Sequence, residues 1–342
     1  MKSVMVTGAT TPIGRALVNR LVADAAHVIA VGREGEASPF ESRDNLLYVT
    51  TDLRRSRDLR SLLFGVGREV DTVVHGALHR SVRRVGSHAR QLNVEATREL
   101  LELCEEHPSI RRCVFQSSAA IYRMDQRQPS IIDERQPLNL DPRAPQWIRD
   151  RVEADLSVCT LMGMSPIEFV VLRFAECLAP SMGSQLHDYL SAPVCLSPLG
   201  FDPMLNLLSL TDMARALVCA VRAHAQGIYN IPGYDTLPLS KAIERWGHRP
   251  IPIPGPLMAP LYRARAFVEG SEFRYDMNHW RFHLNGVLSG KRARHTLGYQ
   301  PKHGIEWPIG GAVLPPPTPK RRAWNGSTAS SWVPQDATST TS

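Results

Sequence analysis

The sequence predicts an α/β protein built on a doubly wound parallel sheet. Short β-type runs alternate with longer helical patterns over the first 175 residues, and the first run leads through a glycine-containing turn straight into a helix. Apolar residues at helical spacing over Arg15 to Ala25 and over Leu92 to Glu106 predict crossover helices. The expected strands are Ser3 to Thr7, His27 to Val31, Leu46 to Val49, Asp71 to His75, Arg112 to Ser117 and Phe169 to Phe174.

Composition is that of an ordinary globular protein. Hydrophobic residues make up 43% and charged residues 21% of the chain, so neither wholesale disorder nor a membrane protein is expected. The net charge is +7, but the basic residues are spread along the chain, and no nucleic-acid partner is expected. No apolar run reaches the ~18 residues of a membrane span and no signal peptide is evident, which favours a cytoplasmic location. The six scattered cysteines form no metal-site pattern, so no metal is expected.

The turn after the first expected strand has the context of a dinucleotide-binding loop. It reads Gly8-Ala9-Thr10-Thr11-Pro12-Ile13-Gly14. Gly8 permits the sharp turn, Gly14 lets helix and strand pack closely, and the helix N-terminus attracts a pyrophosphate. Thr11 stands where the central glycine is usual; its hydroxyl could donate to a phosphate, while its β-carbon narrows the loop. We therefore expect Gly8, Thr10, Thr11, Ile13 and Gly14 to bind a nicotinamide dinucleotide, against the alternative of an ordinary turn between strand and helix.

Several further segments, in order and at similar spacing, resemble the extended short-chain dehydrogenase/reductase superfamily, which includes NAD-dependent epimerases and dehydratases. The resemblance covers about residues 1 to 312. Besides the glycine loop, the matching segments are Asp52-Leu53, Val73-Val74-His75-Gly76-Ala77, Asn93-Val94-Glu95-Ala96-Thr97, Ser117-Ser118-Ala119-Ala120-Ile121-Tyr122, Leu172-Arg173-Phe174, Leu210-Thr211-Asp212-Met213-Ala214, Gly227-Ile228-Tyr229-Asn230-Ile231 and Leu297-Gly298-Tyr299-Gln300-Pro301-Lys302. The resemblance implies that Asp52 and Leu53 meet the adenine, and that Gly76, Ala77 and Asn93 lie beside the cofactor.

The resemblance also implies the domain organisation. A Rossmann domain is expected to comprise residues 1–174 and 205–231, with the chain returning to the sheet from Leu205 onward. A smaller substrate-binding domain is expected to comprise residues 175–204 and 232–312, with the substrate in the cleft between the two. Residues 313–342 are rich in Pro, Ser and Thr and are expected to form a disordered tail. A homodimer is one expected assembly.

In the family that this chain resembles, a Tyr-x-x-x-Lys pair performs proton transfer and holds the nicotinamide ribose. The aligned positions here are Trp147 and Arg151. An indole offers no usable ionisable proton, whereas Arg151 could still hold ribose hydroxyls. The interval from Arg123 to Asp188 contains neither Tyr nor Lys, so no nearby pair replaces the missing one. The cofactor could be held although the usual chemistry is lost.

Other residues are weaker candidates for catalysis. Ser118 matches the family's catalytic serine, and its alternative role is that of a small residue ending a buried strand. Tyr122 could supply a phenol, although the family commonly has a structural tyrosine there. His75 and His79 could titrate near neutral pH. Glu176 and Asp150 could act as acid or base, but a surface or capping role is favoured for both.

The end of the second expected strand bears on the choice of dinucleotide. An acidic residue there usually binds the adenosine ribose hydroxyls of NAD and repels the 2′-phosphate of NADP. Here the strand ends in Gly32-Arg33, which removes the repulsion and offers a guanidinium, so NADP is favoured over NAD. The alternative is that Arg33 stacks on adenine and discriminates little.

Three functions remain in competition, and the last of them is a domain of lipid or cell-envelope metabolism whose Pro-rich and Arg-rich second half meets a partner or membrane surface. The first is an NAD(P)-binding protein of the epimerase/dehydratase type with an atypical active site, whose oxidoreductase chemistry is weak or relocated and whose small-molecule substrate is unknown, with sugar nucleotides as one candidate class. The second is a non-catalytic dinucleotide-binding protein with a regulatory or scaffold role. The fold itself does not choose between them.

Overall fold

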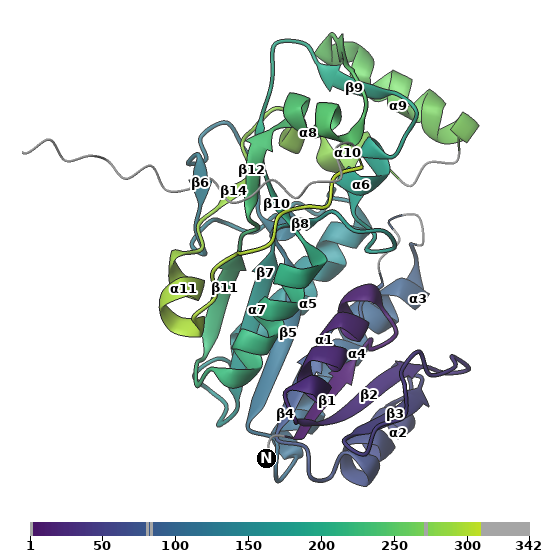
Figure 1. Cartoon of the computed structure of the whole chain (residues 1–342), viewed down its shortest axis with the longest axis vertical. Coiled ribbons are helices and arrows are strands. Elements are labelled where there is room, and N and C mark those ends of the chain that lie inside the picture. The colour runs from purple at the N-terminus through teal and green to yellow at the C-terminus, as the bar shows by residue number, and fades with distance from the viewer. Residues whose placement is uncertain (1–2, 80–81, 83–84, 270–272, 309–342) are drawn as a thin grey trace, which may run out of the picture.

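The computed structural model describes residues 3–79, 82, 85–269 and 273–308 (Figure 1). The tail predicted for residues 313–342 lies outside the described residues. The described chain forms a large parallel sheet covered by helices on both faces, with a smaller set of strands and helices above its carboxyl edge. This arrangement confirms the predicted fold class.

The large sheet has seven strands, all parallel, in the order β11-β7-β5-β4-β1-β2-β3. All six predicted strands are present. The strands are β1 (Ser3–Thr7), β2 (His27–Arg33), β3 (Leu46–Thr51), β4 (Thr72–His75), β5 (Arg112–Ser118), β7 (Glu168–Phe174) and β11 (Gly227–Ile231). The order reverses between β1 and β4, where Thr7 pairs with His75. In doubly wound sheets this switch point opens the crevice that binds ligands.

Helices cover the two faces of the sheet because each presents one apolar stripe to it. On one face α1 (Pro12–Ala23) packs against α7 (Leu210–Arg222), and Leu17, Val18 and Leu21 are buried there. On the other face α2 (Ser56–Ser61), α4 (Ala96–Glu106) and α5 (Gln146–Leu161) enclose a second cluster. Three short helical segments, η1 (Leu62–Val66), α3 (Ser87–Arg90) and η2 (Gln91–Glu95), lie among these elements along the chain.

The smaller part lies above the carboxyl ends of the large sheet (Figure 1). It has its own apolar cluster, which includes Tyr189, Tyr262, Phe273 and Phe282. Its strands pair as β8 (Glu176–Cys177), β10 (Met204–Leu208) and β12 (Asp235–Pro238); β9 (Cys195–Pro198) and β13 (Pro250–Ile253); and β6 (Ile131–Ile132) and β14 (Val287–Leu288). Its helices include α6 (Gln185–Leu190), α8 (Leu239–Trp246), α9 (Gly255–Glu269) and α10 (Tyr275–Asn278), while α11 (Lys291–Leu297) contacts β11.

One topological expectation needs correction. The chain was expected to return to the large sheet from Leu205, but β10 pairs with β8 and β12, and the return begins only with α7. A short apolar strand looks the same in the sequence whichever sheet receives it, because its partners are distant in the chain. The division of the chain into two domains stays a prediction.

The carboxylate of Asp212, in α7, binds the segment around Lys302 and His303 by hydrogen bonds. Its Oδ2 accepts hydrogen bonds from the backbone nitrogens of Lys302 (2.6 Å) and His303 (2.8 Å), and its Oδ1 accepts one from Arg215 (2.6 Å). These contacts join two segments that the sequence comparison with the superfamily had matched separately, around Asp212 and around Lys302.

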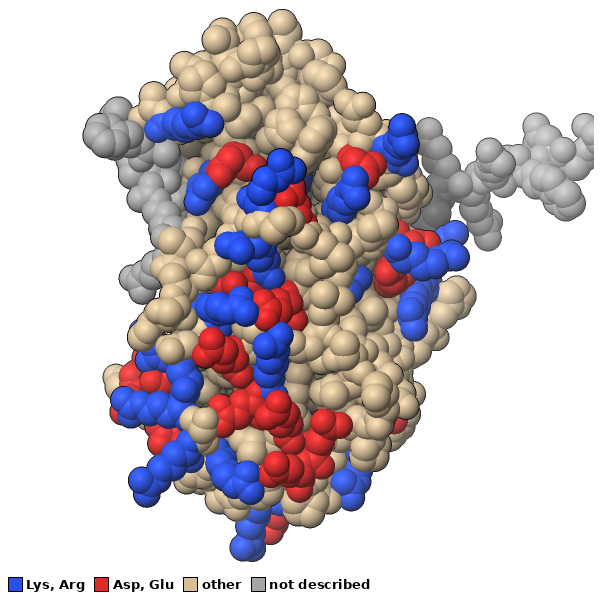
Figure 2. Space-filling model, turned by 180° about the vertical axis from the view of Figure 1, so that it is seen from behind, with Lys and Arg blue, Asp and Glu red and all other residues tan. Residues whose placement is uncertain are grey.

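Among the described residues, none of the helices combines the length and the apolar character that crossing a bilayer requires. On the face shown in Figure 2, basic side chains lie interleaved with acidic ones, most densely over the lower part of the molecule. Charges of opposite sign thus lie close together on that face, consistent with the many Arg–carboxylate pairs in the structure, such as Arg60 with Glu106 and Arg98 with Glu153.

Candidate functional site

The glycine loop lies at the switch point of the sheet. Gly8 has φ +71°, and a β-carbon there would come within 2.8 Å of the carbonyl oxygen of Gly76 and 2.9 Å of the amide nitrogen of Ala77. A β-carbon on Gly14 would overlap the carbonyl oxygen of Gly8 and lie 2.7 Å from the Cα of Ala9. Both glycines are therefore required by close backbone contacts, as the sequence predicted. The loop, the N-terminus of α1 and the end of β4 meet at one place.

Thr11 stabilises the loop itself. Its hydroxyl donates to the carbonyl oxygen of Gly8 (2.7 Å) and accepts from the backbone nitrogen of Gly14 (3.0 Å), so it is the N-cap of α1. The hydroxyl proton expected to be available for a phosphate is thus used within the loop. Ile13 is buried in the core, which leaves only its backbone to face a ligand.

The end of β2 differs from the simple expectation. A β-carbon on Gly32 would overlap the hydroxyl of Tyr48 and lie 3.0 Å from Cγ2 of Thr10, so no acidic side chain fits there without rearrangement. The guanidinium of Arg33, whose side chain is 75% exposed, forms an ion pair with Glu36 (2.9 Å). Glu36, to which no role was given from the sequence, is therefore the partner of Arg33. Its position three residues after Arg33 could have indicated this ion pair.

Asp52 is held by a neighbouring arginine. Arg54 donates from Nε to one carboxylate oxygen of Asp52 (2.8 Å) and from Nη2 to the other (2.6 Å), and these hydrogen bonds lower the pKa of Asp52. The side chain of Asp52 is 11% exposed, and Leu53 is buried. Asp52 and Leu53 were expected to meet the adenine, whereas no role was expected for Arg54.

A buried hydrogen-bond network connects β1, β4 and α4 through His75. The hydroxyl of Thr97 donates to the carbonyl oxygen of Asn93, so it accepts from Nε2 of His75 (3.0 Å), and Nδ1 of His75 then accepts from Thr7 (2.8 Å). Thr7 in turn accepts from the backbone nitrogen of Gly76 (3.2 Å). Burial lowers the pKa of His75 to about 4, so the ring is neutral near neutral pH. His75 supports the loop at Gly76 rather than acting as an acid or base.

Asn93, in η2, supports the same loop. Its side-chain oxygen accepts from the backbone nitrogen of His79 (2.7 Å), and the residue is buried. The amide is thus engaged with the segment after β4, beside Gly76 and Ala77. This contact gives Asn93 a positioning role.

Ser118 and Tyr122 have different surroundings. Ser118 lines a cleft together with Gly76 and Phe174, and its Oγ accepts from the backbone nitrogen of Ala120 (3.2 Å). Tyr122 is 2% exposed and donates to the side-chain oxygen of Asn230 (2.6 Å), and burial raises its pKa to about 12. Among the described residues that line the cleft, Tyr122 does not occur. Its contacts are those of a structural tyrosine.

Trp147 and Arg151, which were expected at the positions of the family's Tyr and Lys, form a stacked pair. The guanidinium carbon of Arg151 lies 4.1 Å from the centre of the Trp147 ring, and both side chains line the cleft with Ser118. Nη2 of Arg151 donates to the carbonyl oxygen of His79 (3.4 Å). The stack therefore lies between the cleft and the segment after β4.

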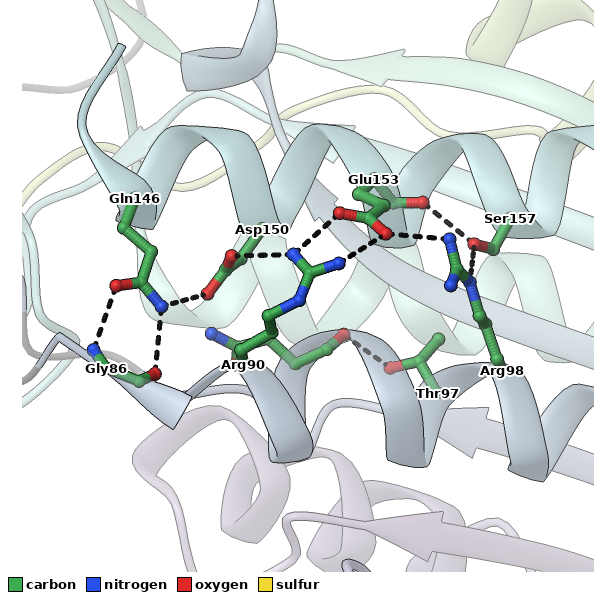
Figure 3. Close-up of polar contacts among 9 residues, drawn as sticks. Gly86, Arg90, Thr97, Arg98, Gln146, Asp150, Glu153 and Ser157 are labelled. Carbon is green, nitrogen blue, oxygen red and sulfur yellow. Dashed lines mark hydrogen bonds and ion pairs between the residues drawn. The ribbon is translucent and has the colours of Figure 1, made fainter. Parts of the chain in front are cut away.

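A polar network holds the helix that carries this pair (Figure 3). Arg90 donates to both carboxylate oxygens of Glu153 (2.8 Å each), and Arg98 donates to one of them (2.7 Å). Gln146 exchanges two hydrogen bonds with the backbone of Gly86, both 2.9 Å. Asp150 contacts Arg90 (3.6 Å), and its pKa is raised by burial. Asp150 thus belongs to this network and does not line the cleft described above.

The cleft contains one acidic group that the sequence analysis had placed in a surface or capping role. Of the described residues lining it, Glu176 is the only carboxylate. The carboxylate accepts from the hydroxyl of Ser184 (2.7 Å) and from Arg281 (2.9 Å). Arg281 comes from a segment more than a hundred residues further along the chain, so no local pattern could have revealed the pair. The described residues contain no group of three or more His, Cys, Asp or Glu side chains suited to a metal ion.

The family model that matches the chain is that of the NAD dependent epimerase/dehydratase family, over residues 4–232. A protein of Mycobacterium tuberculosis, itself described as uncharacterized, is 31% identical over 312 residues, which is 88% of this chain and 80% of the relative.

Solved structures with the same fold include two sugar-nucleotide enzymes. The UDP-glucose 4-epimerase of Thermotoga maritima, solved with UDP-glucose, superposes with a TM-score of 0.68 at 15% identity and covers 89% of this chain and 95% of its own. The dTDP-glucose 4,6-dehydratase of Streptomyces venezuelae, solved with NAD, gives 0.67 at 19% identity and covers 89% and 93%. At these identities the likeness concerns the fold alone.

Proposed function

The chain belongs to the NAD dependent epimerase/dehydratase family, and on that premise we propose that it binds NAD(P) at the carboxyl edge of its large sheet, with weak oxidoreductase or epimerase chemistry. The observation that carries the proposal is the stack of Trp147 and Arg151 beside Ser118. The stack lines a cleft in which Arg151 could hold the dinucleotide. Neither of its two side chains can serve as the acid or base that the family uses.

Dinucleotide binding is supported by the loop geometry. Gly8 and Gly14 allow close backbone packing where β1, β4 and α1 meet, and the N-terminus of α1 has Pro12 in its first turn with Thr11 as cap. The helix dipole and its backbone nitrogens favour a pyrophosphate at this point. Arg151 is the residue we propose for the nicotinamide ribose, and Asn93 and His75 support the loop at Gly76. When bound, the dinucleotide would supply the hydride donor or acceptor.

Weak chemistry is supported by the acid/base groups present. An indole transfers no proton near neutral pH, and a guanidinium stays charged. Glu176 is the candidate for a relocated acid or base, because it lines the same cleft as Ser118. However, its carboxylate already accepts hydrogen bonds from Ser184 and Arg281, and a substrate would have to compete with both for its oxygens. We therefore propose slow turnover rather than a fully functional relocated site.

A preference for NADP over NAD is a further part of the proposal. Gly32 carries no carboxylate to repel a 2′-phosphate, and the exposed guanidinium of Arg33 follows it directly in the chain. Glu36 opposes this preference, because a 2′-phosphate would have to take the guanidinium from it. Replacing Glu36→Gln should therefore strengthen NADPH binding relative to NADH, and Arg33→Ala should remove the preference. Equal changes for both dinucleotides would contradict this assignment.

The competing function is that of a non-catalytic dinucleotide-binding protein with a regulatory or scaffold role. The stack of Trp147 and Arg151 favours this function, because the two side chains stabilise each other's position without a bound substrate.

We also propose a cytoplasmic location and a homodimer. Light scattering on the purified protein measures its oligomeric state.

The decisive experiment measures binding and turnover separately. Calorimetry with NADH and NADPH is expected to give saturable binding, whereas assays with UDP-glucose and with simple secondary alcohols are expected to give negligible turnover. The variant Trp147→Tyr with Arg151→Lys restores both groups one helical turn apart, and a gain in turnover of about 10²-fold is the lower end of what general acid/base catalysis contributes. Arg151→Lys alone, which restores no phenol, is the matched control.

Two results would overturn the proposal. If neither dinucleotide binds at millimolar concentration, the proposal that the chain binds NAD(P) is wrong. If the wild type turns over rapidly and Ser118→Ala does not reduce the rate, the proposal of weak chemistry is wrong and other groups perform the reaction. If the double variant gains nothing while the wild type binds dinucleotide and stays inactive, the non-catalytic function is favoured.

A further inference from the structure

A second pocket, lined mostly by apolar side chains, adjoins the cleft beside Ser118. Glu176 lines both, and Arg281 lines the second. The second pocket lies between the ends of β5 and β7 and the smaller part of the molecule. Ala119 and Ala175 follow those two strands, whereas Leu186, Leu205 and Leu239 belong to the smaller part. Further apolar side chains complete the wall, among them Met124, Phe273, Phe282, Leu284 and Leu288.

The polar side chains of this pocket already have partners within the protein. The amide nitrogen of Asn206 donates to the carbonyl oxygen of Gly233 (3.1 Å) and to Thr236 (2.9 Å), and its oxygen accepts from the backbone nitrogen of Gly233 (2.9 Å). The amide nitrogen of Asn278 donates to Gln185 (3.2 Å) and to the carbonyl oxygen of Arg274 (2.8 Å). A ligand in the pocket would therefore meet few groups that gain a hydrogen bond from it.

The charge of the pocket is balanced. Among the described residues that line the pocket, Arg281 is the one cation, and it is paired with Glu176 at 2.9 Å. A diphosphate carries at least two negative charges, and an arginine that is free to contact it would help to balance them. Here a diphosphate would have to displace Glu176 and then leave that carboxylate beside the phosphates, which is unfavourable in a partly buried site.

We propose that this pocket binds the apolar part of an uncharged substrate, such as a ketone or secondary alcohol with an aliphatic or aromatic group, and not a nucleoside diphosphate sugar. The inference rests on the proposed function, since the pocket serves a reaction only if the adjoining cleft binds a dinucleotide. It assigns a substrate class different from the sugar nucleotides that the superfamily resemblance had suggested. The polar end of the substrate would lie toward Glu176 and Ser118, and its apolar group among Leu205, Leu239 and Phe282.

The test uses the full chain and a neutral fluorescent probe, N-phenyl-1-naphthylamine, whose emission rises in apolar surroundings. The probe is displaced by a series of ketones from 2-butanone to 2-decanone, and in parallel by UDP-glucose. Burial of each added methylene is expected to strengthen displacement by about fourfold until the pocket is filled. UDP-glucose at millimolar concentration is expected to leave the probe in place.

A pair of glycine variants locates the probe. Gly286 lines the pocket, and a β-carbon there would meet nothing within 4 Å, so Gly286→Leu adds volume without a backbone clash. The variant is expected to weaken probe binding by about tenfold or more, because the leucine side chain would take up space that the probe needs. Gly65 in η1 is equally open but does not line the pocket, so Gly65→Leu is the matched control and should leave probe binding unchanged.

The outcomes separate this inference from the proposed function. Displacement by UDP-glucose without dependence on ketone chain length, in a protein that binds NADH, overturns the substrate class and leaves the proposed function intact. A clear chain-length series in a protein that binds neither NADH nor NADPH supports the ligand class and overturns the proposed function. If Gly286→Leu does not fold, the wild-type series still decides, since it needs no variant.

Discussion

Removing the carboxylate of Asp155 should destabilise the protein strongly. Asp155 has no exposed surface and lies on α5, where it accepts hydrogen bonds from Ser117 (2.5 Å) and twice from Arg173 (2.6 and 3.1 Å). Arg173 is 3% exposed and also donates to Tyr122 (3.2 Å). This cluster joins α5 to the ends of β5 and β7, directly beneath Ser118. Its loss would affect the support of the cleft as well as stability.

The structure indicates the size of the effect. Asp155→Ala leaves the guanidinium of Arg173 buried without a counter-ion, which costs about 3 to 5 kcal/mol of unfolding free energy in comparable pairs. A guanidinium keeps its proton in proteins even without an acidic partner, so Arg173 does not avoid the penalty by becoming neutral in the variant. In a chain of this length, each kcal/mol lowers the melting temperature by about 2 °C, which gives a decrease of roughly 6 to 10 °C.

Thermal unfolding followed by circular dichroism measures this decrease. The control is Asp141→Ala, which removes an exposed partner of Arg143 and should leave the melting temperature unchanged. A second control replaces both members, Asp155→Leu with Arg173→Met, and should melt above Asp155→Ala because no buried charge remains. A melting temperature of Asp155→Ala within about 2 °C of the wild type would refute the reasoning.

Two further predictions concern the loop and its support. Gly14→Val should abolish dinucleotide binding measured by calorimetry, because its β-carbon would overlap the carbonyl oxygen of Gly8. The control Gly65→Val has open space around its β-carbon and should bind normally. Retained binding in Gly14→Val would contradict the loop geometry. His75 should make stability depend on pH. Burial lowers the pKa of His75 to about 4 from an ordinary value of 6.5, so the folded state favours the neutral ring. The resulting contribution to the free energy of unfolding is complete above pH 6.5 and is lost as the pH falls toward 4. The total loss is about 3 kcal/mol. Urea unfolding of the wild type and His75→Gln between pH 7 and 4 compares the two slopes, and equal slopes would show that His75 does not titrate in this way.

The sequence alone determined the class of fold and the position of the glycine loop. Strand and helix patterns depend on the spacing of neighbouring residues, so the six predicted strands were found where expected. Gly8 and Gly14 were identified because a sharp turn and a close helix contact leave few alternatives to glycine. That Trp147 and Arg151 stand at the positions of the family's Tyr and Lys stays a prediction, because it rests on the order of residues in the sequence and not on geometry.

Only the tertiary structure decided which polar groups are available. The sequence could not tell that Thr11 uses its hydroxyl within the loop, that Tyr122 is fixed by Asn230, or that Glu176 is paired with Arg281. The last two contacts join residues about a hundred positions apart, and a periodic pattern contains no information about such pairs. Whether a buried side chain is a reactive group or a structural one depends on its hydrogen-bond partners and its exposure to water, and both are fixed only when distant segments pack together.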